Sequence, residues 1–570
     1  MLPTSTDVTV STQAKLPPDA DAVVTFVTQG DGRTLSELLG DDDRRAVERL
    51  LAAGVVRGRA KEIAFDLIDA PKGKHRRIYV VGLGAADKVT PETLRVAGGQ
   101  VARAARKHRL ARLALILPTI ETVAPTWAAD ALVTGLLLAG FRYEEFKGSA
   151  QKKDDDGEKP AALDVTIVAA GAGVGSGGGG SGGGVGASGN PDAAIDVRAA
   201  VERARVIADG QNFARTIASR PGNSINPPSL AAVAQQLARE VGLQVRVLDE
   251  KQMQKLGMGG ILAVGQGSER PPRMIVLEHR GPRGGRGPAA GRGAAGKRAA
   301  GAASTKRGVA GQAAPVLVVG KSITFDTGGI SIKPADRMQE MIFDKSGGMT
   351  VLGLMYAVAR LELPIPVIGI LSSAENMPGG NAYRPGDILR MYNGVTVEVT
   401  NTDAEGRLVL GDALAWGIET FRPSAVVDLA TLTGGVVVAL GHTMAGVMTN
   451  SDALIAEIQR AADHAGEKIW RLPVGDEQRD QIKSHYADIV NSAGRWASPL
   501  QGGAFLSHFV PRDDSVPWAH IDIAGVADTD KELPYYARGA TGWGVRTLVE
   551  WLTSRVAPVA AHATPRAAGG

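Results

Sequence analysis

The stretch PVLVVGKSITFDTGGISIKP, residues 315–334, begins with an apolar run over Pro315–Gly320 that predicts a buried strand. A helical pattern over Gly347–Leu361 follows, and then a second apolar run over Pro364–Leu371. Alternation of strands and helices is typical of a largely parallel sheet that is covered by helices on both faces. This stretch therefore predicts an α/β fold.

The same alternation extends along most of the chain. Before the quoted stretch, it predicts strands at Ala22–Thr28, Arg77–Leu83, Leu113–Leu117, Val165–Ala169, Gln244–Leu248 and Arg273–Glu278, and helices at Asp43–Ala53, Pro91–Lys107, Pro125–Ala139 and Ser229–Val241. After it, strands are expected at Thr396–Val399 and Ala425–Leu429, with a helix over Gly406–Glu419 between them. A chain of 570 residues is too long for one ordinary core, so at least two domains are expected.

Composition divides the chain. Twelve of the nineteen residues in 171–189 are glycine, which predicts a flexible linker. A second stretch, 281–314, is rich in Gly, Ala and Arg and lacks core-forming residues. We expect an N-terminal α/β domain (1–170), a Gly-rich linker (171–195), an interdomain helix (196–218), a catalytic domain (219–557) that contains the disordered insert 281–314, and a disordered tail (558–570).

Bulk properties restrict the class of protein. The chain has no cysteine, which excludes disulfides and thiolate metal sites and fits a reducing compartment. No apolar run approaches the roughly 18–20 residues of a membrane span, and Met1–Lys15 lacks the basic and apolar regions of a secretory signal. These features predict a cytoplasmic protein with no membrane partner.

The basic residues are unevenly distributed. Eight of them lie between Arg280 and Arg307, a segment with no acidic residue. The charge of this segment exceeds the net charge of +4 of the whole chain. Such a segment either keeps a surface loop in solution or follows nucleic-acid phosphates in a salt-dependent manner. The insert has no interleaved aromatic residues, which favours the solubilising loop. Filter binding across a range of salt, with and without residues 281–314, distinguishes these alternatives.

Acidic residues follow three predicted strand ends in the second half of the chain. They are Asp326, Asp344, Asp403 and Glu405, and they are accompanied by Lys321, Lys333 and Arg407. Singly, each is typical of a turn, a helix cap or a surface ion pair. Four carboxylates that meet at the carboxyl edge of a sheet repel one another unless cations neutralise them. Two divalent ions do so in a known hydrolytic arrangement. None of the nine histidines lies in an H-E-x-x-H pattern, which excludes a zincin-type peptidase.

Several motifs resemble those of the leucyl (cytosolic) aminopeptidase family. They are NTDAEGRL (401–408), GKSITFDTGGISIKP (320–334), AENMP (374–378), YRPGD (383–387), DLATLTG (428–434) and WAHIDIAG (518–525), in the family's order. The resemblance extends from about Asn212 to Leu552, and the N-terminal part resembles the family's smaller, variable domain only loosely. It implies a smaller N-terminal α/β domain and a larger C-terminal α/β catalytic domain with a central mixed, mostly parallel sheet.

The resemblance also implies the roles of individual residues. The metal ligands are Lys321, Asp326, Asp344, Asp403 and Glu405, with Asp326 and Glu405 bridging two divalent ions (Mn or Zn); the catalytic residues are Lys333 and Arg407, with bicarbonate at Arg407; and the substrate residues are Met341, Thr431, Leu432, Gly434 and Ala524. It further implies a homohexamer that removes leucine and other, mainly apolar, N-terminal residues from peptides.

Two departures from the family pattern concern the neighbourhood of the site. Lys345 follows Asp344 where the family commonly has methionine, and we expect its side chain to point away from the metals. Ala527 stands where some members carry methionine, which predicts a roomier pocket for the N-terminal side chain. A metal-free homologue that acts as a scaffold is an alternative function, but all seven predicted metal and catalytic positions are intact.

Overall fold

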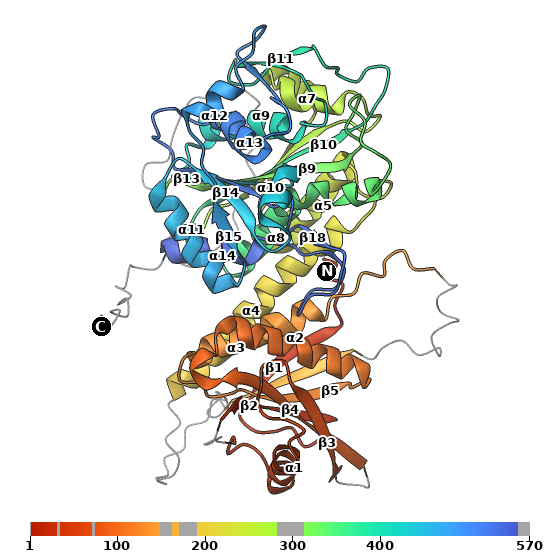
Figure 1. The fold of residues 1–570 in the computed structure, drawn as a ribbon, viewed down its shortest axis with the longest axis vertical. Helices are drawn as coiled ribbons and strands as arrows, with labels where there is room; N and C mark the ends of the chain where they lie inside the picture. The colour runs from red at the N-terminus through yellow and green to blue at the C-terminus, as the bar shows by residue number, and fades with distance from the viewer. Residues whose placement is uncertain are drawn as a thin grey trace, which may run out of the picture.

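The computed structural model describes residues 2–30, 35–70, 74–148, 162–169, 191–281 and 313–556. Two α/β lobes lie one above the other, and the long helix α4 (Pro191–Ala218) runs between them (Figure 1). The helix begins within the range that the sequence analysis assigned to the linker, which ended at 195. The Gly-rich stretch 171–189, nearly all of the basic insert and the C-terminal tail lie outside the described residues.

The N-terminal lobe contains a six-stranded sheet of order β1-β6-β5-β2-β4-β3, parallel except for the β3–β4 pair. Its strands are β1 (Val8–Gln13), β2 (Ala22–Gln29), β3 (Ile63–Ala70), β4 (Lys74–Ala85), β5 (Arg112–Ile116) and β6 (Leu163–Val168). Helices α2 (Pro91–Lys107) and α3 (Pro125–Ala139) cover one face, and α1 (Asp41–Ala52) covers the other. The period-2 patterns of β1 and β3 were missed in the sequence analysis, because both are edge strands with exposed side chains such as Leu67.

Helix α4 joins the lobes through buried polar contacts. Arg215 is fully buried, and its Nη1 donates to the Leu138 carbonyl at the end of α3 (2.8 Å), while its Nε donates to the Ala540 carbonyl of the larger lobe (2.9 Å). Asn212 donates to the carbonyl of Leu137. Because Arg215 bonds to a carbonyl in each lobe, these contacts connect the two lobes to one helix.

The C-terminal lobe contains an eight-stranded sheet of order β15-β14-β17-β13-β9-β10-β8-β7. Its strands are β7 (Gln244–Leu248), β8 (Arg273–His279), β9 (Val316–Asp326), β10 (Val367–Asn376), β13 (Ala425–Ala430), β14 (Ala445–Thr449), β15 (Ile469–Arg471) and β17 (Trp518–Asp522). The four central strands β17, β13, β9 and β10 are mutually parallel, while β14, β8 and β7 join through antiparallel pairs. This confirms the predicted mixed, mostly parallel sheet.

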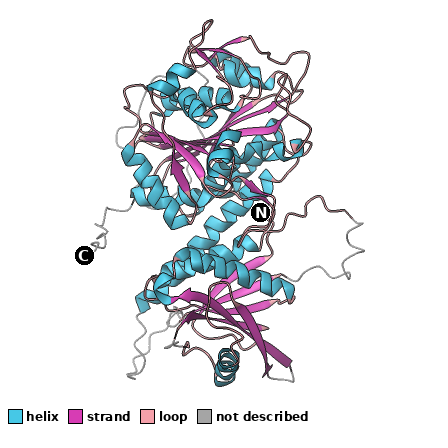
Figure 2. Cartoon of the chain, viewed as in Figure 1, coloured by secondary structure: helices cyan, strands magenta, loops and turns pink. Residues whose placement is uncertain are grey.

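Helices cover both faces of this sheet, as Figure 2 shows. One face packs against α4, α5 (Pro227–Val241), α8 (Ser346–Arg360), α11 (Asp452–Ala465) and α14 (Val545–Val556). The other packs against α7 (Gly259–Gly265), α9 (Gly406–Phe421) and α13 (Ser498–Ser507). The remaining short helices are α6 (Glu250–Leu256), η4 (Met338–Lys345), α10 (Gly434–Leu440) and α12 (Asp476–Gln481). The predicted α/β class is therefore confirmed.

One strand prediction placed its residues in the wrong sheet. The segment predicted at Thr396–Val399 forms β12 (Thr396–Glu398), which pairs with β11 (Ile388–Arg390) and β16 (Ile489–Val490) in a separate three-stranded sheet. A last pair, β18 (Asp528–Thr529) with β19 (Gly539–Ala540), completes the strands of the described residues. Within this described part, no helix combines the length and the apolar character that a membrane crossing requires.

Candidate metal centre

Strand β9 carries two of the predicted ligands. We expected Lys321 and Asp326 to follow a strand that ended at Gly320, but β9 continues to Asp326, so both lie within the sheet. They are five positions apart, so regular alternation would place them on opposite faces. The pairing with β10 shifts register between Ala374 and Asn376, where β9 has one residue more than its partner. This bulge restores both side chains to the same side.

Asp344 is not at a strand end, contrary to the sequence interpretation. It lies in η4, immediately before α8. The start of α8 packs against the sheet so closely that a Cβ at Gly347 would lie 2.2 Å from the Leu429 carbonyl oxygen. Glycine at this position therefore allows the helix start to approach the strands and brings Asp344 to Lys321.

Asp403 and Glu405 lie in the turn between β12 and α9, so they do not extend from a strand of the central sheet. Glu405 is the N-cap residue of α9, where the helix dipole favours a negative charge. A Cβ at Gly406 would lie 2.6 Å from Lys321 Cε. This close approach places the Glu405 carboxylate against the Lys321 amine.

The two lysines and four carboxylates form one cluster, in which Lys333 and Asp403 are partly exposed and the others are buried. Lys321 Nζ lies 2.8 Å from Asp344 Oδ1 and 2.8 Å from Glu405 Oε1. Lys333 Nζ lies 2.8 Å from Asp326 Oδ2 and also pairs with Asp403. Ligand oxygens of Asp326, Asp403 and Glu405 all lie within 4.8 Å of one another. The structure thus brings together all five predicted ligands and the predicted catalytic Lys333.

Burial controls the charge of these groups. Loss of solvent raises the pKa of Glu405 to about 8, and the neighbouring Asp326 carboxylate adds to the shift. Burial likewise raises the pKa of Asp344 to about 6, although Lys321 opposes the shift. Burial disfavours the charge on Lys321, but Asp344 and Glu405 outweigh it and raise the pKa of this amine. In the absence of other cations, the lysines are the counter-ions of the carboxylates.

The donor set fits divalent cations. Two lysines face four carboxylates, and the buried oxygens Asp344 Oδ2 and Glu405 Oε2 have no hydrogen-bond partner among the described residues. A buried carboxylate oxygen without a partner is costly, and a cation removes that cost. Oxygen ligands suit Mn²⁺ and also bind Zn²⁺.

Arg407, the second predicted catalytic residue, lies in the first turn of α9. Its Nη1 donates to the Asn491 carbonyl (2.8 Å), and its guanidinium carbon lies 6.0 Å from the centre of the Phe505 ring. Burial lowers its pKa to about 10, so it stays a cation at neutral pH. It therefore offers a buried positive charge beside the carboxylate cluster.

One of the predicted substrate residues contacts this cluster. Thr431 connects directly to it, because its Oγ1 donates to Asp344 Oδ1 (2.7 Å) and its carbonyl accepts from Lys321 Nζ (2.9 Å). Leu432 and Ala524 both donate their backbone N–H groups to Asp522 Oδ1. Met341 is placed by η4, and Gly434 begins α10.

Two residues near the site were missed as functional candidates. Asn376 is fully buried, and its Nδ2 donates to Asp326 Oδ1 (2.8 Å) and to the Thr402 carbonyl (3.0 Å), which orients a predicted metal ligand. Asp522 holds the substrate segments. Both lie inside motifs that the sequence analysis quoted, AENMP and WAHIDIAG, so the motifs themselves were the available signal.

Lys345 lies beside the cluster but bonds elsewhere. Its Nζ donates to the backbone carbonyls of Arg220 (2.9 Å) and Ile342. The expectation that Lys345 points away from the metals agrees with these contacts. Burial lowers its pKa to about 7.

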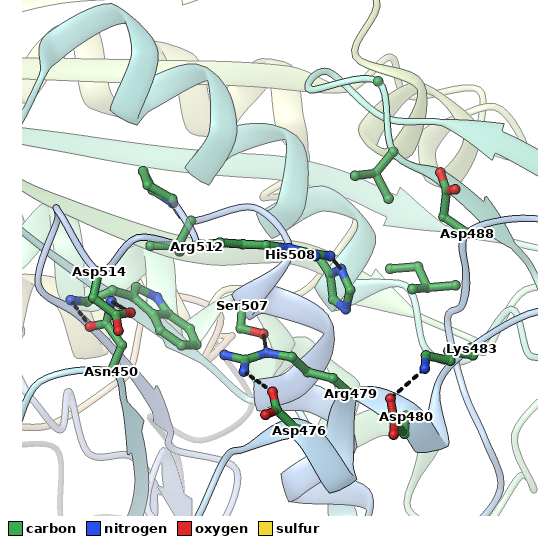
Figure 3. A pocket seen from close by; sticks show the side chains of 16 residues that line it. Asn450, Asp476, Arg479, Asp480, Lys483, Asp488, Ser507, His508, Arg512 and Asp514 are labelled. Atoms are coloured by element: carbon green, nitrogen blue, oxygen red, sulfur yellow. Dashed lines mark hydrogen bonds and ion pairs between the residues drawn. The ribbon is translucent and has the colours of Figure 1, made fainter.

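A large cavity lies at the other edge of the sheet. It has a volume of about 770 Å³, and the charged residues Arg479, Lys483, Asp488 and Arg512 are among those that line it (Figure 3). Trp518, the first residue of β17, also lines it, whereas Asp522 at the other end of β17 faces the Leu432 segment. None of the predicted metal, catalytic or substrate residues described by the structure lines this cavity.

A mixed, mostly parallel sheet with a cluster of carboxylates and lysines is the arrangement expected of a metal-dependent hydrolytic enzyme of the α/β class. Known proteins narrow this class. The model of the cytosol aminopeptidase family, catalytic domain, matches residues 212–298 and 288–549, and that of the same family's N-terminal domain matches residues 23–150. The chain belongs to the cytosol aminopeptidase family.

Individual relatives agree with this assignment. The chain is 38% identical over 513 residues to the "Probable cytosol aminopeptidase" of Cenarchaeum symbiosum (strain A), covering 89% of this chain and 92% of that one. It is 41% identical over 477 residues to the protein of the same name in Syntrophotalea carbinolica, covering 84% and 85%. Among solved structures, the bottromycin maturation enzyme BotP in complex with Mn matches with a TM-score of 0.75 and 30% identity, covering 94% and 100%. The protein is a metal-dependent aminopeptidase.

Proposed function

We propose that Lys321, Asp326, Asp344, Asp403 and Glu405 would hold two divalent ions, Mn or Zn, in this aminopeptidase. The observation that carries the proposal is the convergence of these side chains around two buried carboxylate oxygens that have no partner among the described residues. The structural relative BotP, solved in complex with Mn, supports a metal of this kind. When bound, such ions acidify water and polarise a peptide carbonyl.

Lys321 is an unusual metal ligand, because a lysine is normally protonated at neutral pH. A lysine binds a metal only as the neutral amine, whereas its carboxylate neighbours raise its pKa in the absence of ions. Divalent ions on the same carboxylates take over the counter-ion role and favour loss of the proton. Thr431 keeps the amine in place through its carbonyl oxygen.

Lys333 and Arg407 perform the proposed catalytic roles. Lys333 stays a cation, because Asp326, Glu405 and Asp403 together outweigh its burial and raise its pKa. It is the donor that stabilises the oxyanion when water adds to the peptide carbonyl. Arg407 has no acceptor and cannot be a base. Its buried charge is suited to hold bicarbonate, which would accept and return the proton.

The proposed substrates are peptides that lose one N-terminal residue, with preference for leucine and other, mainly apolar, side chains. Support comes from Thr431, which bonds to Asp344, and from Leu432 and Ala524, which share Asp522 as an acceptor. Metal analysis of the purified protein, paired with a panel of aminoacyl substrates, tests the proposal. We expect two equivalents of metal and the highest kcat/KM for leucyl substrates. Internal cleavage or a metal-free active protein would contradict it.

Ala527→Met is expected to reduce kcat/KM for substrates with bulky N-terminal residues relative to alanyl substrates, because the longer side chain fills the pocket. Ala527 is only 2% exposed, so overpacking is expected to cost about 1–3 kcal/mol of stability as well. Ala462→Met, a fully buried position in α11, reproduces the overpacking away from the site and is the matched control. Unchanged kcat/KM ratios across the panel would refute the proposed pocket.

The proposed assembly is a homohexamer. Support comes from large apolar side chains that a single chain leaves exposed, with exposed fractions of 89% for Val438, 76% for Tyr486 and 75% for Trp496. Light scattering is expected to give the mass of six chains, and a monomer across the working concentration range would contradict the proposal.

We also place the protein in the cytoplasm, on the basis of its lack of cysteine and the names of its relatives.

A further inference from the structure

Asp522 joins the two sides of the proposed substrate pocket. This residue ends β17 and is fully buried. Its Oδ1 accepts the backbone N–H of Leu432 (3.1 Å) and that of Ala524 (3.2 Å), while its Oδ2 accepts the hydroxyl of Thr433 (2.7 Å). Leu432 follows β13 and Ala524 follows β17, which are neighbouring parallel strands. One carboxylate therefore sets the separation between two chain segments.

The segment that Asp522 holds also contacts the metal ligands. Thr431 precedes Leu432, and it bonds to Asp344 through its hydroxyl and to Lys321 through its carbonyl. On the other side of the segment, Thr433 Oγ1 accepts the N–H of Val436 and begins α10. A displacement of Asp522 would thus be transmitted to two metal ligands, although Asp522 itself bonds to neither.

A buried ion pair, Asp428–His520, lies near Asp522 in the sheet. His520 lies two residues earlier in β17, so it projects from the same face of the sheet. Its Nδ1 lies 2.6 Å from Asp428 Oδ1, and Trp518 Nε1 donates to Asp428 Oδ2 (2.8 Å). The charge of His520 lowers the pKa of Asp522, in opposition to the burial that raises it. Asp428 and His520 thus form a buried polar pair on the face of the sheet from which Asp522 projects.

We propose that Asp522 is a positioning residue that determines specificity. It holds Leu432 and Ala524 at the separation that admits the N-terminal side chain of the substrate, and it keeps Thr431 aligned with Asp344 and Lys321. The inference rests on the proposed function of the site, since it assigns the pocket to the N-terminal residue.

Three substitutions separate geometry from charge. Asp522→Ala removes all three acceptor contacts. Asp522→Asn keeps a carbonyl oxygen for the two backbone N–H groups but loses the charge. Asp522→Glu keeps the charge but moves the acceptors by one methylene. Because a displacement of about 1 Å in a catalytic site can cost 10²-fold in rate, the position of the acceptor should matter more than its charge.

The variants are compared by kcat and KM on alanyl, leucyl and phenylalanyl substrates, with metal content and Tm measured in parallel. Asp522→Ala is expected to lower kcat by about 10²-fold and to narrow the spread of kcat/KM among the substrates, with metal content unchanged. Asp522→Asn is expected to keep most of the wild-type differences in kcat/KM among the substrates. Asp522→Glu is expected to lose them. If the alanine variant does not fold, the Asn and Glu variants alone make the comparison.

Several results would overturn the inference. One is an Asp522→Ala variant with the wild-type differences in kcat/KM among the substrates. A second is an Asp522→Glu variant that keeps these differences while Asp522→Asn loses them. A third is a loss of metal that accounts for the loss of rate. The wild-type protein in the same assay distinguishes the two levels of the proposal. If it shows no metal-dependent aminopeptidase activity, the proposed function fails. If it is active and the variants keep its specificity, only the role of Asp522 fails.

Discussion

Removal of divalent ions with EDTA is expected to abolish peptide hydrolysis, and Mn²⁺ or Zn²⁺ is expected to restore it. The physical reason is the charge of the cluster: four carboxylates face two lysines, and two buried carboxylate oxygens have no partner among the described residues. Without ions, Lys333 can still donate a hydrogen bond, but it cannot lower the pKa of a bound water as a metal ion does. The measurement is kcat for a leucyl substrate before chelation, after it and after addition of metal.

Chelation is also expected to lower the Tm. Ions that bind only the folded state stabilise it by about 2.7 kcal/mol at a free concentration 100 times Kd. The carboxylates that provide this energy come from β9, η4 and the turn before α9, so they are assembled only by folding. Glu405→Gln is the control, since the substitution should reduce the Tm response to metal. An apoprotein, verified by metal analysis, that retained full activity would disprove the two-metal proposal.

Lys333→Ala is expected to lower kcat by about 10²–10³-fold, the usual effect of removing one oxyanion donor. Metal content should stay near that of the wild type, because all five proposed ligands remain. The structure gives a further reason: Lys333 pairs with Asp326 and Asp403, so its removal deletes a cation that competes with metal for these carboxylates. The measurements are kcat, KM and metal content on the same preparation.

Two controls make the result specific. Lys251→Ala changes an exposed lysine on α6 and should leave kcat and metal content unchanged. Lys333→Arg keeps the charge but alters the donor geometry, so it should keep the wild-type metal content and recover only part of the rate. A collapse of metal occupancy in Lys333→Ala would show that Lys333 has a structural role and is not catalytic.

The spacing of apolar residues along the chain predicts much of the local structure. Helices such as α2 and α3 were predicted with the bounds that the structure has, because each begins at a proline and carries an apolar face. Edge strands such as β1 and β3 were not predicted, since they bury few side chains and their pattern is weak. Residue types that can bind metal are also visible in sequence, because the donor atoms of a side chain are the same in every fold.

The sequence by itself therefore determined the α/β class, the family and the set of residues that converge on the site. Only the tertiary structure decided how they converge. A bulge in β9 turns Asp326 to the side of Lys321, Gly347 lets α8 carry Asp344 onto the sheet, and Asp522 binds a segment 90 residues away along the chain. Local periodicity cannot encode such relations, because they depend on close packing and hydrogen bonds between residues that folding alone brings together.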